Sequence, residues 1–290
     1  MNTTKRARLF LILSMASFGT LAPFVRRISV SSGELALYRA VLAALLIGVF
    51  LLITKQQLSF TSLKKELLLL LLSGVAMGFN WILLFEAYKF TTVAIATLSY
   101  YFAPVIVTLV CPLLFHEKLT KKQILCFVMS TLGLSLVTGI TNLGSGGNDA
   151  VGILFGLGAA LLYATVILLN KFIKGVTGIH RTFLQFLAAI AVLIPYVLLT
   201  SGVNLGNLDL TGWSCLLIVG LVHTGVTYCL YFTSLKELPG QEAAILSYID
   251  PLVAVVIGVV VLQEPLSWQQ LLGGAMILGF TLLNELDIGK

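Results

Sequence analysis

Long blocks of apolar residues fill most of the chain, and short polar breaks separate them. Each of ten such blocks is about 20 residues long, the length that an α-helix needs to cross the hydrocarbon core of a bilayer. The blocks do not alternate apolar and polar positions, as the strands of an outer-membrane barrel do. The pattern therefore predicts an all-α membrane fold with ten transmembrane helices. We expect these helices at 9–28, 34–54, 67–88, 91–114, 121–140, 151–171, 179–200, 213–235, 241–262 and 267–286.

The composition excludes several classes of protein. Of the 290 residues, 58% are hydrophobic and 10% are charged, whereas charged residues make up about 25% of ordinary soluble domains. So few charges cannot cover the surface of a soluble globular enzyme, and the chain is neither a disordered protein nor a nucleic-acid-binding domain. We therefore expect the lipid bilayer as its surroundings and no nucleic acid among its partners.

The distribution of Lys and Arg predicts the orientation of the chain. With ten spans, fourteen of these residues fall on the side of both termini, and three, Arg26, Arg27 and Lys89, fall on the other side. Cytoplasmic loops carry the excess of Lys and Arg in membrane proteins, so both termini are predicted to be cytoplasmic. The first block could also be read as a signal peptide, but Pro23 and the arginine pair stand where a cleavage site would be.

The chain matches itself when it is shifted by 147 residues. Between 78–129 and 225–276, 12 of 52 positions are identical without a gap. Shared Leu and Val are expected between two apolar stretches, but shared Lys, Tyr, Pro and Glu are not. The identical pairs include Phe85/Phe232, Lys89/Lys236, Tyr101/Tyr248, Pro104/Pro251 and Glu117/Glu264. The match predicts an internal repeat.

Each predicted repeat holds five helices. We expect the first repeat at 1–143, a glycine-rich linker at 144–149 and the second repeat at 150–290. An odd number of crossings inverts the second repeat relative to the first. Inverted repeats are a common architecture of secondary transporters, which bind their substrate near the bilayer midplane between the halves. The pattern therefore favours alternating access to a central cavity.

The two repeats share a short E-x-L junction after a proline-bearing fourth helix. The residues are Ala103-Pro104 with Glu117-Lys118-Leu119, and Asp250-Pro251 with Glu264-Pro265-Leu266. Together with the ten helices, they resemble the drug/metabolite transporter superfamily, EamA type, over essentially the whole chain. The resemblance implies transport, often export, in a prokaryotic plasma membrane. Members handle amino acids, sugars, nucleotide sugars, amines or drugs, so no set of binding residues is carried over.

Two ionisable side chains are predicted at middle depth. Asp250 lies about nine residues into its span, and His223 lies about ten residues into a span that starts from the opposite face. Such groups are costly within a membrane and usually functional, so either could bind and release a proton during transport. The alternatives are that Asp250 satisfies backbone donors next to Pro251, and that His223 is a packed, neutral side chain.

Three charged residues lie nearer the predicted extracytoplasmic face. Arg39 sits about five residues inside its span, where it could hold a substrate carboxylate by a bidentate contact. It could equally extend its charged end towards the interface. Glu86 and Lys89 stand one helical turn apart and are expected to form an interfacial ion pair.

Aromatic and amide side chains gather at middle depth, although Tyr and Trp in membrane proteins usually mark the interfaces. A cavity lined by aromatic rings and a few hydrogen-bonding groups suits a small amphipathic metabolite. Ordinary helix packing is the alternative. The candidate substrate-binding residues are Asn80, Trp81, Tyr100, Tyr101, Tyr163, Tyr228 and Tyr248, together with Arg39, His223 and Asp250.

The sequence lacks the motifs of several enzyme classes. It has no P-loop, no H-E-x-x-H and no G-x-S-x-G, and its four cysteines have no metal-ligand spacing. We expect no cofactor and no metal. The favoured function is secondary active transport, with export of an amino acid or a similar amphipathic solute. The alternatives are an integral membrane enzyme acting on lipid and a channel or receptor. G-x-x-x-G patterns at 74–78 and 152–156 permit close helix packing, and they leave open whether the protein is a monomer or a homodimer.

Overall fold

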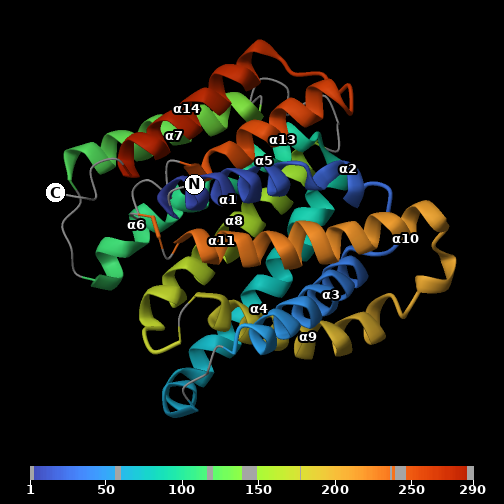
Figure 1. The fold of residues 1–290 in the computed structure, drawn as a ribbon. Helices are drawn as coiled ribbons and strands as arrows, with labels where there is room; N and C mark the ends of the chain where they lie inside the picture. Colours follow the sequence, from blue (N-terminus) through green and yellow to red (C-terminus); the bar gives the residue numbers. More distant parts are fainter. Residues whose placement is uncertain are drawn as a thin grey trace.

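Helices form all the regular structure that the computed structural model describes (Figure 1). The described residues are 3–55, 60–115, 120–138, 149–176, 178–235, 237–238 and 246–285. The helices of the first half are α1 (Thr3–Gly19), α2 (Leu21–Val25), α3 (Ser32–Ile53), α4 (Phe60–Phe90), α5 (Val93–Tyr100), α6 (Ala103–Phe115) and α7 (Lys121–Thr138). Those of the second half are α8 (Asp149–Phe172), α9 (Gly178–Thr200), η2 (Leu205–Asn207), α10 (Leu210–Leu217), η3 (Ile218–Val226), α11 (Thr227–Leu235), α13 (Ile249–Val260) and α14 (Trp268–Glu285).

These helices confirm the predicted all-helical membrane fold of about ten helices. Within the described residues, six segments are long and apolar enough to cross a membrane, and two shorter apolar helices follow near the end of the chain. The long segments are Ser32–Ile53, Lys64–Phe90, Val93–Val110, Asp149–Phe172, Gly178–Thr200 and Leu210–Leu235. The α1–α2 pair and α7 occupy the first and fifth predicted spans. The junction residue Glu117 and most of the predicted linker at 144–149 lie outside the described residues.

Polar side chains define where several helices begin. Ser31 accepts a hydrogen bond from the backbone N–H of Glu34, and the Glu34 carboxylate accepts one from the backbone N–H of Ser31, which is a complete capping box for α3. Glu34 is buried and also accepts the backbone N–H of Asn204 at 2.6 Å. At the starts of α5 and α10, the side chain of Thr92 accepts the backbone N–H of Ile95, and that of Asp209 accepts the backbone N–H of Gly212. These caps satisfy backbone donors that a helix start leaves free.

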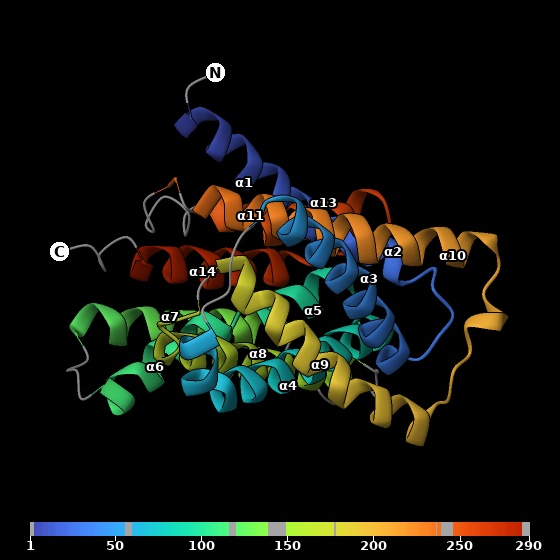
Figure 2. The ribbon, with the colours of Figure 1, turned by 60° about the horizontal axis from the view of Figure 1, so that its bottom comes forward.

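Helices of the two halves pack against one another throughout the molecule. The helix α4 runs along α8 and α9, α3 packs on α9 and η3, and α1 packs on α11 and α13. Figures 1 and 2 show α7 and α14 lying side by side on one flank. The contact between α7 and α14 is close because Gly133 and Gly273 each face the other's backbone carbonyl oxygen, where a Cβ would not fit. The centre of the molecule is therefore built from both halves.

The glycines of the G-x-x-x-G patterns pack within the chain. A Cβ at Gly74 would meet the carbonyl oxygen of Gln185 at 2.5 Å, and a Cβ at Gly152 would meet Thr91 at 2.6 Å. These glycines let α4 approach α9, and α8 approach the start of α5. Small residues thus bring helices of opposite halves into backbone contact.

The fourth span of each half is interrupted at the same repeat position. In the first half, α5 ends at Tyr100 and α6 begins at Ala103, just before Pro104. In the second half, α13 begins directly after Tyr248, with Pro251 in its first turn. Proline has no N–H to donate to the carbonyl four residues earlier, which is that of Tyr100 for Pro104 and that of Ser247 for Pro251. The helix hydrogen-bond pattern is therefore interrupted at matching places in the two halves.

The eighth span contains a π-helix, η3, between α10 and α11. Within it the hydroxyl of Thr224 donates to the carbonyl of Val219, five residues earlier, at 2.7 Å. Gly220 and Gly225 allow η3 to lie directly on Leu42 and Leu46 of α3. π-helical turns are rare and are found frequently at functional sites. This one directs Thr224 towards α3.

Candidate functional site

A hydrogen bond joins the two helix breaks. The hydroxyl of Tyr101, at the end of α5, donates to Oδ2 of Asp250, in the first turn of α13, over 2.6 Å. The backbone carbonyl of Asp250 lies against Gly19, at the α1–α2 junction, where a Cβ would stand 2.5 Å from it. The Asp250 carboxylate thus has a side-chain partner from the other half of the molecule, whereas the alternative prediction gave it backbone donors next to Pro251.

Tyrosines surround this contact. Tyr100 of α5 stacks on Tyr163 of α8, with ring centroids 5.2 Å apart and planes inclined by 22°. Tyr100 also meets the ring of Tyr101 edge to face at 5.9 Å. Asp250 lies close enough to Tyr100 to interact with it electrostatically. Tyr163 is 38% exposed, so it forms the accessible edge of the group.

Arg39 is buried in the middle of the helices and does not extend towards an interface, so that alternative prediction is wrong. Only 4% of Arg39 is exposed. Its Nε donates to the hydroxyl of Thr224 in η3 at 2.7 Å. Its guanidinium lies over the rings of Trp81 and Phe85, 4.8 and 5.6 Å from their centroids. Among the described residues, no carboxylate pairs with Arg39.

Two aromatic residues at matching repeat positions pack on the same phenylalanine ring. Trp81 and Tyr228 occupy matching repeat positions, and both pack edge to face on Phe186, at 5.2 and 5.4 Å. Tyr228 lies within electrostatic range of both Arg39 and Asp250. The two charged groups therefore both lie near one aromatic cluster, an arrangement that could accept a solute with groups of both signs.

His223 and Asp250 border the same helix junction without a hydrogen bond between them. The Nε2 atom of His223 lies 3.1 Å from the hydroxyl of Thr20, next to the Gly19 that Asp250 contacts. Its ring packs on Phe24 at 4.9 Å, and the side chain is buried. The structure thus places the two candidates for proton coupling on either side of the α1–α2 junction.

Two predicted residues lie apart from the charged groups. The Asn80 amide donates to the carbonyl oxygen of Ala159 at 2.6 Å, so it ties α4 to α8 within the packed interior. Tyr248 is buried directly before α13. The structure therefore brings together seven of the ten predicted residues, namely Arg39, Trp81, Tyr100, Tyr101, Tyr163, Tyr228 and Asp250.

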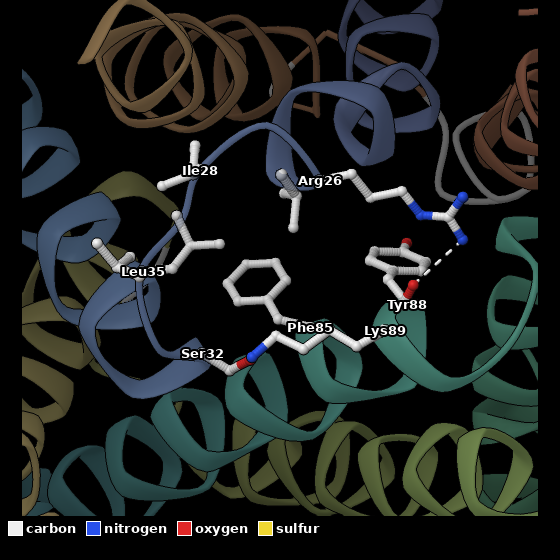
Figure 3. Close-up of a pocket in the computed structure, with 9 residues that line it drawn as sticks. Arg26, Ile28, Ser32, Leu35, Phe85, Tyr88 and Lys89 are labelled. Atoms are coloured by element: carbon white, nitrogen blue, oxygen red, sulfur yellow. Dashed lines mark hydrogen bonds between the residues drawn. The ribbon is translucent and has the colours of Figure 1, made fainter. Parts of the chain in front are cut away.

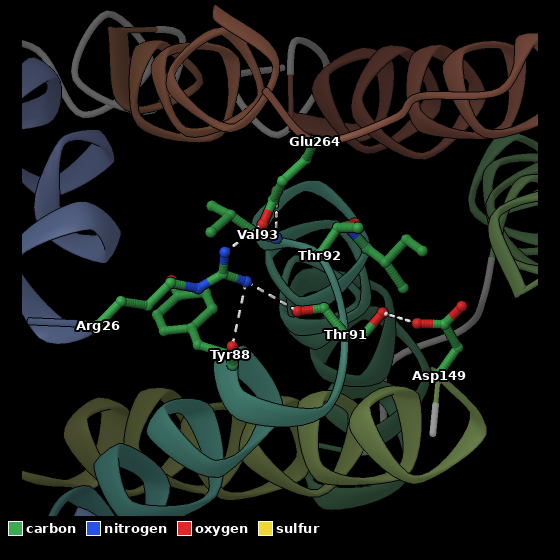
Figure 4. A network of polar contacts seen from close by, with 8 residues as sticks. Arg26, Tyr88, Thr91, Thr92, Val93, Asp149 and Glu264 are labelled. Atoms are coloured by element: carbon green, nitrogen blue, oxygen red, sulfur yellow. Dashed lines mark hydrogen bonds and ion pairs between the residues drawn. The ribbon is translucent and has the colours of Figure 1, made fainter. Parts of the chain in front are cut away.

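A second polar network closes one end of the helices, here called the Arg26 end (Figure 4). Arg26 donates to the carbonyl oxygens of Tyr88 and Thr91, at 3.1 and 3.0 Å. It also forms an ion pair of 2.5 Å with Glu264, which precedes α14. The other carboxylate oxygen of Glu264 accepts the backbone N–H of Val93, the first residue of α5, at 2.7 Å. One carboxylate of the second half therefore binds two elements of the first.

Sequence reasoning did not predict this network. Arg26 was counted only as a loop charge, and Glu264 entered only as part of the repeated junction. The signal was the glutamate itself, because an acidic residue recurring at both junctions needs a partner. The structure adds a further link between the halves, in which Thr91 donates to Asp149 at the start of α8 over 2.7 Å.

A cavity of about 360 Å³ lies beside this network, between the connection after α2 and the ends of α3 and α4 (Figure 3). Its lining residues are Val25, Arg26, Ile28, Val30, Ser32, Leu35, Phe85, Tyr88 and Lys89. Lys89 pairs with Glu86 at 3.0 Å, which confirms the predicted ion pair. Phe85 belongs to the wall of this cavity and also lies beneath Arg39. The cavity and the aromatic cluster therefore share one ring.

The described residues contain no group of three or more His, Cys, Asp or Glu side chains that could hold a metal ion. The cluster offers charged groups, hydrogen-bonding groups and aromatic faces for recognition. The polar atoms that it presents are the terminal nitrogens of Arg39, the Asp250 carboxylate and tyrosine hydroxyls.

Comparisons with known proteins agree with this architecture. The model of the EamA-like transporter family matches residues 5–139 and 150–285, one match in each half. The chain is 31% identical over 274 residues to the uncharacterized transporter YxxF of Bacillus subtilis (strain 168), covering 92% of this chain and 85% of that protein. It is 33% identical over 199 residues to an uncharacterized transporter of Archaeoglobus fulgidus, covering 68% of each chain.

A likeness to a solved crystal structure extends over nearly the whole fold. The TM-score is 0.62 at 17% sequence identity, over 95% of this chain and 96% of that one. At this identity the likeness shows the fold alone. The two family matches and the similar transporters show more: the chain belongs to the EamA-like transporter family, and it is a membrane transporter rather than an enzyme.

Proposed function

We propose that this protein is a secondary active transporter that exports an amino acid or a similar small amphipathic solute. Substrate binds between the two halves, which are inverted repeats and give alternating access to the two faces of the membrane. The hydrogen bond between Tyr101 and Asp250 carries this proposal, because it joins the helix breaks of both halves. Interrupted helices at corresponding positions of two repeats are the best structural pointer to a transporter's binding site.

A zwitterionic solute fits the charges of the cluster. Arg39 and Asp250 flank the aromatic group that includes Tyr228. A solute carboxylate would bind the guanidinium, a solute ammonium would bind the carboxylate, and an apolar side chain would pack on the rings. The bacterial relative supports location in a plasma membrane, and the excess of Lys and Arg supports cytoplasmic termini. The Arg26 end is then extracytoplasmic.

Asp250 is the proposed site of proton coupling. Its side chain faces the Tyr101 hydroxyl, and Tyr88, Tyr100 and Tyr228 lie within electrostatic range. Protonation of Asp250 would remove a charge from the boundary between the halves. This would change the relative stability of the two transport states. His223 is the second candidate, since its imidazole binds Thr20 at the α1–α2 junction.

Counterflow in proteoliposomes tests the function. Vesicles loaded with one unlabelled amino acid, amine or sugar at high concentration are diluted into a trace of the labelled compound. A carrier accumulates the label transiently inside, whereas a channel only equilibrates it. We expect accumulation of at least one amino acid, and empty vesicles serve as the control. Failure of every compound in the panel to exchange would contradict the proposal.

A further inference from the structure

The guanidinium of Arg39 is held so that one edge of it stays available. Its Nε donates to the Thr224 hydroxyl oxygen at 2.7 Å, and that hydroxyl gives its own proton to the carbonyl of Val219. Thr224 therefore acts towards Arg39 purely as an acceptor and fixes the direction of the side chain. Trp81 and Phe85 fix the plane of the group by lying beneath it. What remains is the pair of terminal nitrogens, which is the edge that binds a carboxylate by two parallel hydrogen bonds.

The charge of Arg39 lacks a protein anion. In the ranges that the structure describes, ion pairs form at Arg26 and Lys89, and neither involves Arg39. Burying a guanidinium without an anion is expensive, and contacts with aromatic faces recover only part of that cost. Tyr228 and Tyr100 also lie near Arg39, but neither is a carboxylate that could pair with it. A buried, oriented and unpaired cation is therefore the state expected of a site whose anion arrives with a ligand.

The surroundings restrict what that ligand can be. Aromatic rings enclose Arg39, so the group bound there is small and is attached to an apolar body. Phe85, which lies under Arg39, also lines the cavity of about 360 Å³ at the Arg26 end, and most of the side chains that line this cavity are apolar. Across the cluster lies Asp250, whose charge would repel a second carboxylate. The surroundings favour a compact molecule with one carboxylate over a dicarboxylate or a phosphate ester.

We infer that Arg39 is the subsite for the single carboxylate group of a small organic solute, which binds end-on to the two terminal nitrogens. Thr224 is a positioning residue that holds Nε, and Trp81 and Phe85 hold the guanidinium plane. This inference rests on the proposed transport function and deepens it by naming the group that every good substrate should carry. Solutes that lack a carboxylate should compete poorly, whatever the shape of their apolar part.

Trp81 provides a direct readout, because its ring contacts the guanidinium. The other tryptophans are Trp213 and Trp268, so the variant W213F/W268F leaves Trp81 as the only indole. The purified variant is titrated with isovalerate and, separately, with the neutral isostere isovaleramide, at constant ionic strength set with chloride. We expect isovalerate to change Trp81 emission saturably and isovaleramide to leave it unchanged.

Substitutions in this background locate the effect. R39Q should raise the half-saturating isovalerate concentration at least tenfold. R39K should fall between R39Q and the parent, because it keeps the charge without the planar fork. T224V should weaken binding less than R39Q does. R6Q is the charge-matched control, because Arg6 also lies over an aromatic ring, that of Phe10, but belongs to α1 and not to the cluster. R6Q should change the half-saturating concentration less than twofold.

The result that overturns the subsite is equal response to isovalerate and isovaleramide, or an isovalerate response that survives R39Q. The first comparison needs no variant of Arg39, so a misfolded R39Q protein would not obscure it. The outcome is also separable from the transport proposal. Exchange of neutral or cationic solutes without any carboxylate binding would contradict the subsite and support the transport function. Carboxylate binding without exchange of any solute would support the subsite and contradict the transport function.

Discussion

The two arginines at Arg26 and Arg39 show opposite uses of the same side chain. Arg26 is partly exposed, yet it is fully matched, with two backbone carbonyls and the carboxylate of Glu264. Arg39 is buried and has one neutral hydroxyl and two aromatic faces as partners. Water could solvate the partly exposed charge of Arg26 at small cost. The buried charge of Arg39 has no such solvation, so it has the greater need of a protein or ligand partner.

The contrast distinguishes two roles. The pair of Arg26 and Glu264, here called the closing contact, holds the two halves together, whereas Arg39 is a group that can bind a ligand. A matched pair between halves stabilises one arrangement of the helices and has no capacity for a ligand. An unmatched buried charge destabilises the empty protein and becomes favourable once an anion binds. Substitutions in one region at a time should therefore have different effects on stability and on transport.

The largest effect is expected from Arg39→Gln on transport. Loss of two charge-assisted hydrogen bonds to a carboxylate should lower kcat/KM for an exchanged amino acid about 30-fold, which corresponds to about 2 kcal/mol. The measurement is initial-rate counterflow in proteoliposomes with matched protein content. Equal loss for an amine without a carboxylate would mean that Arg39 acts through the fold.

Asp250→Asn should impair transport driven by a pH gradient without abolishing solute exchange. If Asp250 binds the coupled proton, the variant should lose accumulation driven by an imposed pH gradient, by about tenfold, which corresponds to about 1.4 kcal/mol. It should retain counterflow, which needs no net proton movement, although KM should rise for solutes whose ammonium group would bind the carboxylate. Tyr101→Phe removes the hydrogen bond but keeps the carboxylate, so it should remain pH-dependent. Undiminished gradient-driven accumulation in the Asp250 variant would make that residue structural.

The closing contact should appear as coupling between Arg26 and Glu264. Arg26→Gln and Glu264→Gln should each lower the free energy of unfolding, and the double variant should be little worse than either single one. We expect a coupling free energy of about 1 kcal/mol, because Arg26 is partly exposed to solvent. Thermal unfolding of the four proteins in one detergent measures it. Additive losses would show that the pair contributes nothing.

Asn80→Ala should affect stability without affecting substrate affinity. It leaves the carbonyl of Ala159 without its side-chain donor, at a cost of about 1 kcal/mol. KM for exchange should stay within twofold of the parent value, since the Asn80 amide is engaged between α4 and α8. A rise in KM with unchanged thermal stability would show that Asn80 contributes to substrate binding.

The smallest effect is expected from Lys89→Ala. Its ion pair with Glu86 lies on one exposed helix surface, where such pairs contribute less than about 0.5 kcal/mol. Thermal unfolding should be unchanged within error. A large loss would indicate that the cavity lined by Lys89 depends on its charge.

The sequence was most informative where one residue acts on its own helix. Pro251 indicated a local loss of helix hydrogen bonding in the fourth span of the second half, because proline lacks an N–H in any surroundings. The spacing of Glu86 and Lys89 predicted their ion pair for the same local reason. Position along a helix also placed the aromatic residues at middle depth.

Contacts between distant helices were not predictable in this way. Depth placed Arg39 near an interface, but the face of α3 on which it lies and the π-helix that presents Thr224 are set by packing between the halves. The same holds for Arg26 and Glu264, which are far apart in sequence and carry no local pattern that joins them. The repeat predicted that such contacts exist without predicting the partners.

Glu264 gives the closed end a particular mode of release. Its two oxygens bind Arg26 and the first N–H of α5, so a displacement of this one side chain removes both contacts in a single event. Arg26 would then keep only its two backbone carbonyl partners, and Val93 would lose the acceptor of its N–H although Thr92 still caps α5. The contacts of Glu264 at this end should therefore break together, so that the end opens briefly and completely instead of loosening gradually.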